Sequence, residues 1–237
     1  MSPASSHGGT APHGSTADTS AMEALYPFLY AGKTDVAAVL EGVRHSTVAK
    51  VREITELRSA VAARDSARLL ACAQEMAVRF AAGGRLLAFG NGGSATDAQQ
   101  IATLFLNPGP AGRPLPAFGL ANDTAVVTAL CNDIGVDVVF ARQIAAFGGP
   151  QDIAVALSTS GNSENLLRGL DEAVRRGMLT VGIAGYDGGK MSELDGLDYL
   201  FVAPSSSVHR IQEAQTTIYH ALWELTVAAL GDGEGLR

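Results

Sequence analysis

The chain has 237 residues, enough to bury a sizeable core as one large α/β domain or as two small ones. Its formal net charge of −7 argues against nonspecific binding to nucleic acid or to an acidic membrane surface. The two cysteines, Cys72 and Cys131, lie in apolar stretches, so we expect reduced core thiols and no Cys-x-x-Cys metal site. There is no membrane-spanning apolar run and no signal-peptide core, so we expect a cytoplasmic protein with neither a membrane nor a nucleic-acid partner.

The amino-terminal segment differs in composition from the rest. Residues 1–22 are mostly Ser, Thr, Gly, Ala, Pro and His, and they carry too little apolar surface to offset the entropy of ordering. We therefore predict a disordered tail there, followed by a short aromatic segment at 23–34 that is too small to form its own core. The main domain is expected to cover 35–232, and residues 233–237 form a second tail.

Two amphipathic helices are predicted at the start of this domain. Apolar residues recur at helical spacing over 35–60, and the pattern returns over 66–82. Such helices must bury their apolar faces, either against the rest of the same chain or against another subunit.

A glycine-rich turn follows the apolar run Leu86–Phe89. It carries Asn91, Gly92, Gly93 and Ser94 and leads into an alternating Ala/polar stretch, a pattern typical of strand, tight loop and helix start. Backbone N–H groups in such a loop can approach a ligand, and the helix start adds partial positive charge, so we predict an anion site. The alternative is an ordinary turn, since the sequence fits neither G-x-G-x-x-G nor a Walker loop.

The rest of the chain alternates between strands and helices. Strands are predicted at 116–120, 153–157, 180–184 and 199–202, and helices at 95–106, 125–131, 137–147, 165–176 and 210–230. This alternation predicts an α/β fold with a mostly parallel, doubly wound sheet covered on both faces, hence three layers.

A second polar loop follows the strand at 153–157. Ser158, Thr159, Ser160 and Ser163 place four hydroxyls around Gly161, which makes a neutral cradle of donors suited to a phosphate. A simple helix cap would need only one or two of them. Because both loops follow parallel strands, we expect them to face one crevice at the carboxyl edge of the sheet.

Three segments together resemble the signatures of the sugar isomerase (SIS) domain family. They are Gly90–Ser94, Leu157–Ser163 and Arg210–Glu213, and more narrowly they resemble the phosphoheptose isomerase branch over about residues 36–230. The resemblance implies the SIS fold, a phosphorylated sugar as ligand, and aldose–ketose isomerisation of sedoheptulose 7-phosphate or a related sugar phosphate. It also implies a homo-oligomer, a tetramer or a dimer, with active sites near subunit contacts.

The same resemblance locates the catalytic positions and two departures from them. In the family, a His and a Glu four residues apart follow the first loop, the last helix adds a Gln and a His, and some members bind zinc with these four. Here Gln212 and His220 match the last helix, but Gln100 and Leu104 occupy the first two positions. Because leucine cannot bind a metal or move a proton, we expect no zinc and no other cofactor.

Isomerisation needs a base and an acid, and we assign these roles to His220, Glu213 and His209. The alternatives are that His220 is a hydrogen-bonded core histidine, that Glu213 positions a loop or the sugar, and that His209 is a surface histidine. Gln212 and Asp133 are predicted to bind the substrate with the two loops. Two other functions stay open, a noncatalytic sensor of a phosphosugar or sugar nucleotide and a protein-interaction scaffold of the same fold.

Overall fold

The structure, a computed structural model, describes residues 36–109 and 112–231. The predicted tail at 1–22, the aromatic segment at 23–34 and the tail at 233–237 lie outside these residues. The chain divides into two units, residues 1–49 and 50–237, with the boundary inside the first helix. In the described parts of the chain, no helix is both long and apolar enough to cross a membrane.

The first helix corrects one prediction. Helix α3 runs without interruption over 46 residues, Val36–Ala81, where the sequence predicted two helices. The gap in the apolar pattern near residues 61–65 therefore does not mark a turn. The physical reason is that neither glycine nor proline occurs between residues 43 and 82, so nothing breaks the backbone hydrogen bonding.

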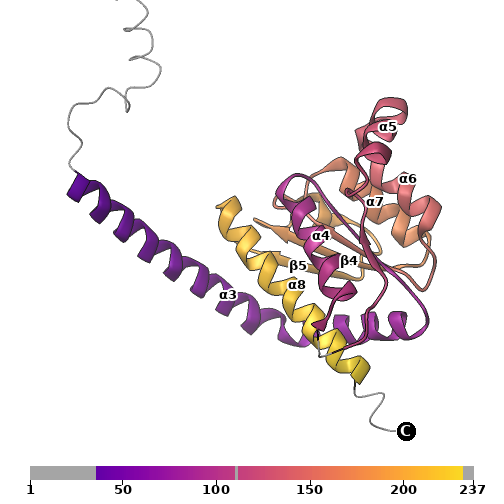
Figure 1. Cartoon of the computed structure of the whole chain (residues 1–237), viewed down its shortest axis with the longest axis horizontal. Coiled ribbons are helices and arrows are strands. Elements are labelled where there is room, and N and C mark those ends of the chain that lie inside the picture. Colours follow the sequence, from indigo (N-terminus) through magenta and orange to yellow (C-terminus); the bar gives the residue numbers. More distant parts are fainter. Residues whose placement is uncertain (1–35, 110–111, 232–237) are drawn as a thin grey trace, which may run out of the picture. The chain divides into compact units, whose positions relative to one another are not determined.

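The sheet has the predicted parallel architecture (Figure 1). Its five strands run in the order β2-β1-β3-β4-β5, and every neighbouring pair is parallel. Strand β1 (Leu86–Gly90) lies between β2 (Ala117–Gly119) and β3 (Ile153–Leu157), and β4 (Leu179–Gly185) and β5 (Tyr199–Ala203) complete the sheet. Because the strand order reverses between β1 and β3, a crevice is expected outside the carboxyl ends of these two strands.

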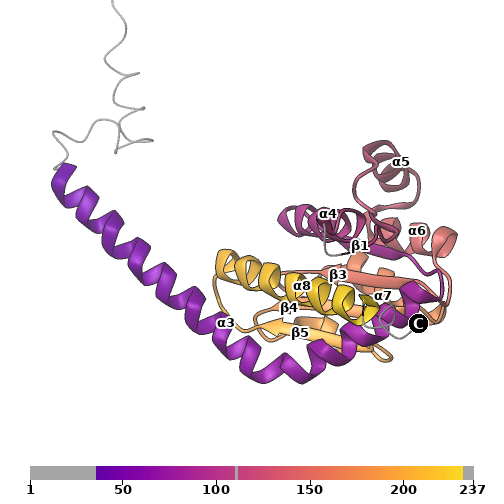
Figure 2. The same ribbon diagram turned by 60° about the horizontal axis from the view of Figure 1, so that its bottom comes forward.

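Helices cover both faces of the sheet, which confirms the three-layer α/β class (Figures 1 and 2). Alternate residues of β1 point to opposite layers: Leu86 and Ala88 join a core with α3, α4 and α8, whereas Leu87 and Phe89 join one with α6 and α7. The remaining elements are α4 (Gly93–Leu106), α5 (Thr124–Ile134), η2 (Val136–Val138), α6 (Val139–Phe147), α7 (Glu164–Arg175), η3 (Gly189–Glu193) and α8 (Val208–Gly231).

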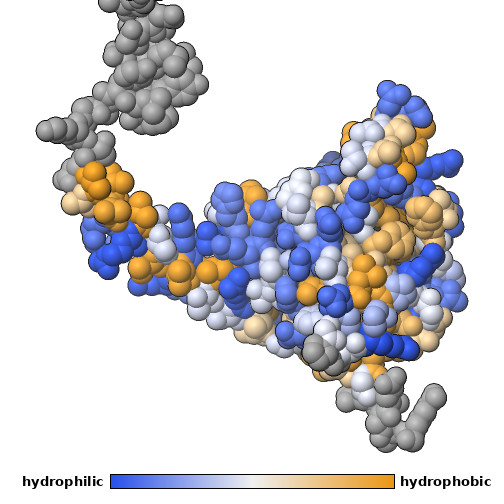
Figure 3. Space-filling view, viewed as in Figure 1, coloured by the Kyte–Doolittle hydropathy of each residue, from blue (hydrophilic) through white to orange (hydrophobic). Residues whose placement is uncertain are grey.

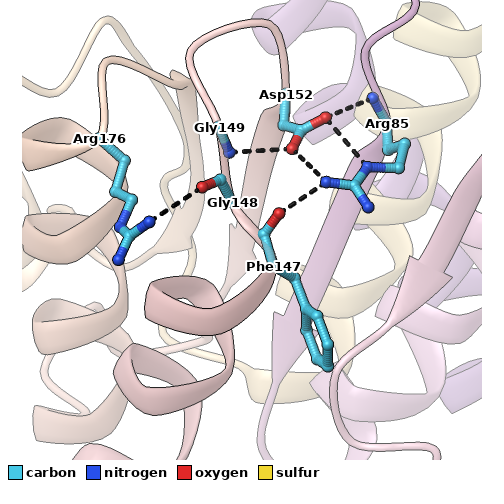
Figure 4. A network of polar contacts seen from close by, with 6 residues as sticks. All are labelled: Arg85, Phe147, Gly148, Gly149, Asp152 and Arg176. Carbon is cyan, nitrogen blue, oxygen red and sulfur yellow. Dashed lines mark hydrogen bonds and ion pairs between the residues drawn. The ribbon is translucent and has the colours of Figure 1, made fainter.

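An ion pair joins the amino ends of β1 and β3 (Figure 4). The buried Asp152 carboxylate accepts bonds from the Arg85 backbone N–H at 2.8 Å, from the Arg85 Nη2 at 2.8 Å and from the Gly149 N–H at 2.9 Å. Burial alone would raise the pKa of Asp152, but these bonds outweigh it, so the pKa lies below its usual value. Arg85 also donates to the Phe147 carbonyl, which ties the end of α6 to the same cluster.

We expect Asp152→Asn to lower the free energy of unfolding by about 2 kcal/mol at pH 7, because a buried charge-assisted hydrogen bond is lost. The pKa of the Asp152 carboxyl is about 4 in the unfolded chain and lower in the folded protein, so the ionised carboxylate stabilises the fold above about pH 4. This stabilisation is lost as the pH falls through the folded-state pKa. The difference between wild type and variant should therefore shrink below about pH 4. Urea unfolding from pH 7 to pH 2.5 measures this, and Asp171→Asn on the exposed face of α7 serves as control. A constant difference over that range would contradict the assignment.

Candidate active site

The first loop joins β1 to α4 and lies against α8. Gly92 occupies the N-cap position of α4, and no side chain caps this helix. A Cβ on Gly93 would collide with the Gln212 Nε2, so the side-chain amide of Gln212 lies directly against the loop. The structure thus brings Gln212 to the predicted anion loop, in the place where the sequence predicted a ligand-binding residue.

The second loop joins β3 to α7 and uses its hydroxyls to hold its own shape. The Ser158 Oγ accepts a hydrogen bond from the Gly161 N–H at 2.9 Å, and the Ser160 Oγ accepts one from the Asn162 N–H at 3.2 Å. Each of these hydroxyls keeps its proton for donation to a ligand. Ser163 stands at the N-cap of α7 but makes no side-chain cap bond, so helix capping does not account for this set of hydroxyls.

A reciprocal amide pair joins the two loops. The Asn91 Nδ2 donates to the Asn165 Oδ1 at 2.9 Å, and the Asn165 Nδ2 donates to the Asn91 Oδ1 at 3.0 Å. Asn165 is buried in the first turn of α7. Its role could not be predicted from the sequence, because nothing local to Asn165 indicates a partner 74 positions away.

Gln215 is a second residue that sequence reasoning missed. It is fully buried on α8, and its Nε2 donates to the carbonyls of Ser158 and Ile183, both at 3.0 Å. These bonds fix the end of β3 relative to β4 and α8. The only available signal was a second glutamine three residues after Gln212 in the same helix.

A third loop, residues 185–191, packs on the second. Gly161 has a φ of 67°, and a Cβ there would collide with the Gly188 carbonyl. The Met191 N–H donates to the Gly161 carbonyl and the Lys190 N–H donates to the Asn162 Oδ1, both at 2.9 Å. Loops after β1, β3 and β4 therefore meet at one edge, as parallel strands require.

The three predicted acid–base residues have different surroundings on α8. His220 is half-buried, with its ring centroid 5.2 Å from that of Tyr219 and 6.3 Å from that of Trp223. It makes no side-chain hydrogen bond with another described residue, so the structure offers no partner for a hydrogen-bonded core histidine. Glu213 pairs with Arg210, with 2.6 Å between Oε2 and Nη1, and His209 is exposed in the first turn.

Asp133 is exposed near the end of α5, where its Oδ1 accepts a bond from the Asn132 Nδ2 at 2.9 Å. Helix α5 contributes no buried residue. No hydrogen bond links Asp133 to the two loops within the described residues, so its role as a sugar ligand stays a prediction.

The two altered family positions do not form a metal site. Leu104 packs with Trp223 against the apolar core, and Gln100 is exposed on α4. Nowhere in residues 36–109 and 112–231 do three His, Cys, Asp or Glu side chains gather closely enough to hold a metal. The donor set present here therefore does not fit zinc.

We expect a coupling free energy of about 1 kcal/mol between Asn91→Ala and Asn165→Ala, because each variant leaves the other amide without its partners. Urea unfolding of both single variants and the double variant measures it. Asn91→Ala combined with Asn132→Ala, on the exposed α5, should show no coupling. Additive effects of Asn91→Ala and Asn165→Ala would show that the pair does not join the loops in solution.

Comparison with known proteins places the chain in a family. A family model described as SIS domain matches residues 51–185. The phosphoheptose isomerase of Solidesulfovibrio magneticus is 46% identical over 163 residues, which are 68% of this chain and 78% of that protein. The phosphoheptose isomerase of Aquifex aeolicus is 41% identical over 73% of this chain and 91% of its own length.

A solved structure agrees with this placement. The phosphoheptose isomerase of Neisseria gonorrhoeae superimposes with a TM-score of 0.71 at 33% identity, covering 78% of this chain and 99% of that one. The residues that the family model matches, 51–185, contain both loops described above. The chain therefore belongs to the SIS-domain family, in its phosphoheptose isomerase branch.

Proposed function

We propose that this protein binds a sugar phosphate at its two polar loops and isomerises sedoheptulose 7-phosphate or a related sugar phosphate. The observation that carries the proposal is the Asn91–Asn165 pair, which holds the first loop against the start of α7, where the second loop ends. The relatives named above are phosphoheptose isomerases, which supports the same reaction.

Neutral donors would hold the phosphate. Ser94, Ser158, Thr159, Ser160 and Ser163 supply hydroxyls, and α4 and α7 begin at these loops without side-chain caps. Because the chain carries a net charge of −7, an anionic ligand must be held by such local donors and not by the overall field. Asn91, Gly92 and Gly93 would contribute the backbone around it, and Gln212 would orient the sugar.

His220 is the proposed acid–base residue. In an aldose–ketose isomerisation, a proton leaves one carbon next to the carbonyl and returns to the neighbouring carbon, while a second proton moves between the two oxygens. A half-buried imidazole without a hydrogen-bond partner can take and return one of these protons. Glu213 and His209 are the proposed sources of the second transfer, with Glu213 held by Arg210.

One observation favours a second function. Leu104 places an apolar side chain where the family has a carboxylate, and it packs into the core with Trp223. A sensor that binds a phosphosugar without turning it over would keep the loops and lose this group. Binding and turnover must therefore be measured separately.

We expect purified protein to bind sedoheptulose 7-phosphate, and Ser160→Ala combined with Ser163→Ala to weaken binding at least about tenfold by removing two hydroxyl donors. Calorimetry measures the affinity, with Ser59→Ala on exposed α3 as the control. In parallel, NMR follows turnover with and without zinc. His220→Ala should slow turnover at least about a hundredfold, and zinc should not restore it.

The outcomes separate the two functions. Turnover by wild type that is lost in His220→Ala supports the isomerase. Binding without turnover identifies a sensor instead. Affinity unchanged in the double serine variant would reject the proposed phosphate site, whichever function holds.

We also propose that the protein resides in the cytoplasm. A separate proposal is that it is a homo-oligomer, with a tetramer as the expected form. Among the described residues, eight large exposed apolar side chains lie in α3, and six of these are in its first half: Val36, Val39, Leu40, Val43, Val48 and Val51 (Figure 3). Exposing such residues to water is unfavourable, and contact with other subunits would bury them.

Light scattering should give the mass of a tetramer for wild type and a smaller mass for Leu40→Glu combined with Val43→Glu. These charges lie one turn apart on α3 and would oppose burial of that face. Ser46→Glu, at an exposed polar position of the same helix, is the control. A monomeric wild type would contradict the proposal.

A further inference from the structure

Tyr186 has an unusual backbone conformation in the third loop. Its φ of 51° is positive, and among the described residues it shares this property only with glycines. A hydrogen bond from the Gly188 N–H to the Gly185 carbonyl, 2.9 Å long, closes a tight turn around it. L-residues adopt this region at a cost that glycine does not carry. The turn would therefore form more readily with glycine at this position.

The ring of Tyr186 does not recover this cost inside the fold. The residue is 41% exposed and makes no side-chain hydrogen bond or ring contact with another described residue. The other two tyrosines in the described residues behave differently: the Tyr199 hydroxyl donates to Glu75 at 2.6 Å, and Tyr219 is buried with its hydroxyl facing Asp97. A strained residue whose side chain makes no hydrogen bond or ring contact with the described residues points to a role toward a ligand.

The turn that carries Tyr186 is held against the phosphate loop on both sides. Before it, a Cβ on Gly185 would lie 2.5 Å from the Thr159 carbonyl oxygen. After it, a Cβ on Gly161 would collide with the Gly188 carbonyl, and a Cβ on Gly189 would collide with the Ser160 carbonyl. Tyr186 thus presents an exposed aromatic ring from a rigid turn beside the second loop.

We infer that Tyr186 is a specificity-determining residue of the proposed site and contacts the carbon chain of a ligand whose phosphate lies in the second loop. This inference rests on the proposed sugar-phosphate function. The loops supply donors for a phosphate but no apolar surface for a sugar. The face of an aromatic ring attracts the C–H edges of a sugar, so Tyr186 would distinguish a sugar phosphate from phosphate alone.

Calorimetry with sedoheptulose 7-phosphate and with inorganic phosphate tests this on the full chain. Tyr186→Gly should weaken sugar-phosphate binding about three- to tenfold and leave inorganic phosphate binding unchanged. Tyr186→Phe keeps the ring and should bind both as wild type does. Because glycine relieves the positive φ, the Tm of Tyr186→Gly should equal or exceed that of wild type, so loss of folding does not explain the result.

Phe147→Ala is the matched control, because Phe147 is an exposed aromatic residue, 48% accessible, at the amino edge of the sheet. It should change neither affinity. If wild type binds both ligands and Tyr186→Gly weakens both equally or neither, the inference about Tyr186 is wrong and the proposed function stands. If wild type binds neither ligand, the proposed function fails and this inference fails with it.

Discussion

The candidate site depends on one neutral interaction, the paired side-chain amides of Asn91 and Asn165. Two loops from different strands can form a single binding surface only if their spacing is held, and these uncharged side chains hold it here. Each amide satisfies one donor and one acceptor of the other, so the pair avoids the penalty of a buried unpaired polar group. Gln215 lies beneath the second loop, where its Nε2 donates to the carbonyls of Ser158 and Ile183, while its buried Oε1 has no hydrogen-bond partner among the described residues.

Most of the fold could be predicted because its signals are local. Strand β3 is a run of five apolar residues between polar boundaries, and it was predicted with the bounds that the structure has. Asp123 caps α5 by accepting a bond from the Val126 N–H, and aspartate is a preferred residue at this position of a helix. The prediction of two helices over 35–82 was wrong because a weaker stretch of an amphipathic pattern does not end a helix that lacks glycine and proline.

The site was predictable in part for the same reason. Clustered glycines and hydroxyls marked both loops, and parallel topology implied that they meet. Asn165 and Gln215 were missed because their partners lie 74 and 57 positions away in the chain, and an isolated amide has no pattern of its own. The strain at Tyr186 was equally invisible, since the residues of a turn do not reveal which of them has a positive φ.

The two edges of the sheet are fastened by different chemistry. At the amino edge an arginine–carboxylate cluster joins β1 to β3, whereas at the carboxyl edge neutral amides and backbone groups hold the loops. Dissolved ions screen interactions between partly exposed charges but hardly affect neutral hydrogen bonds. The neutral bonds that hold the loops of the ligand-binding edge together should consequently keep their geometry across the ionic strengths that a cell experiences.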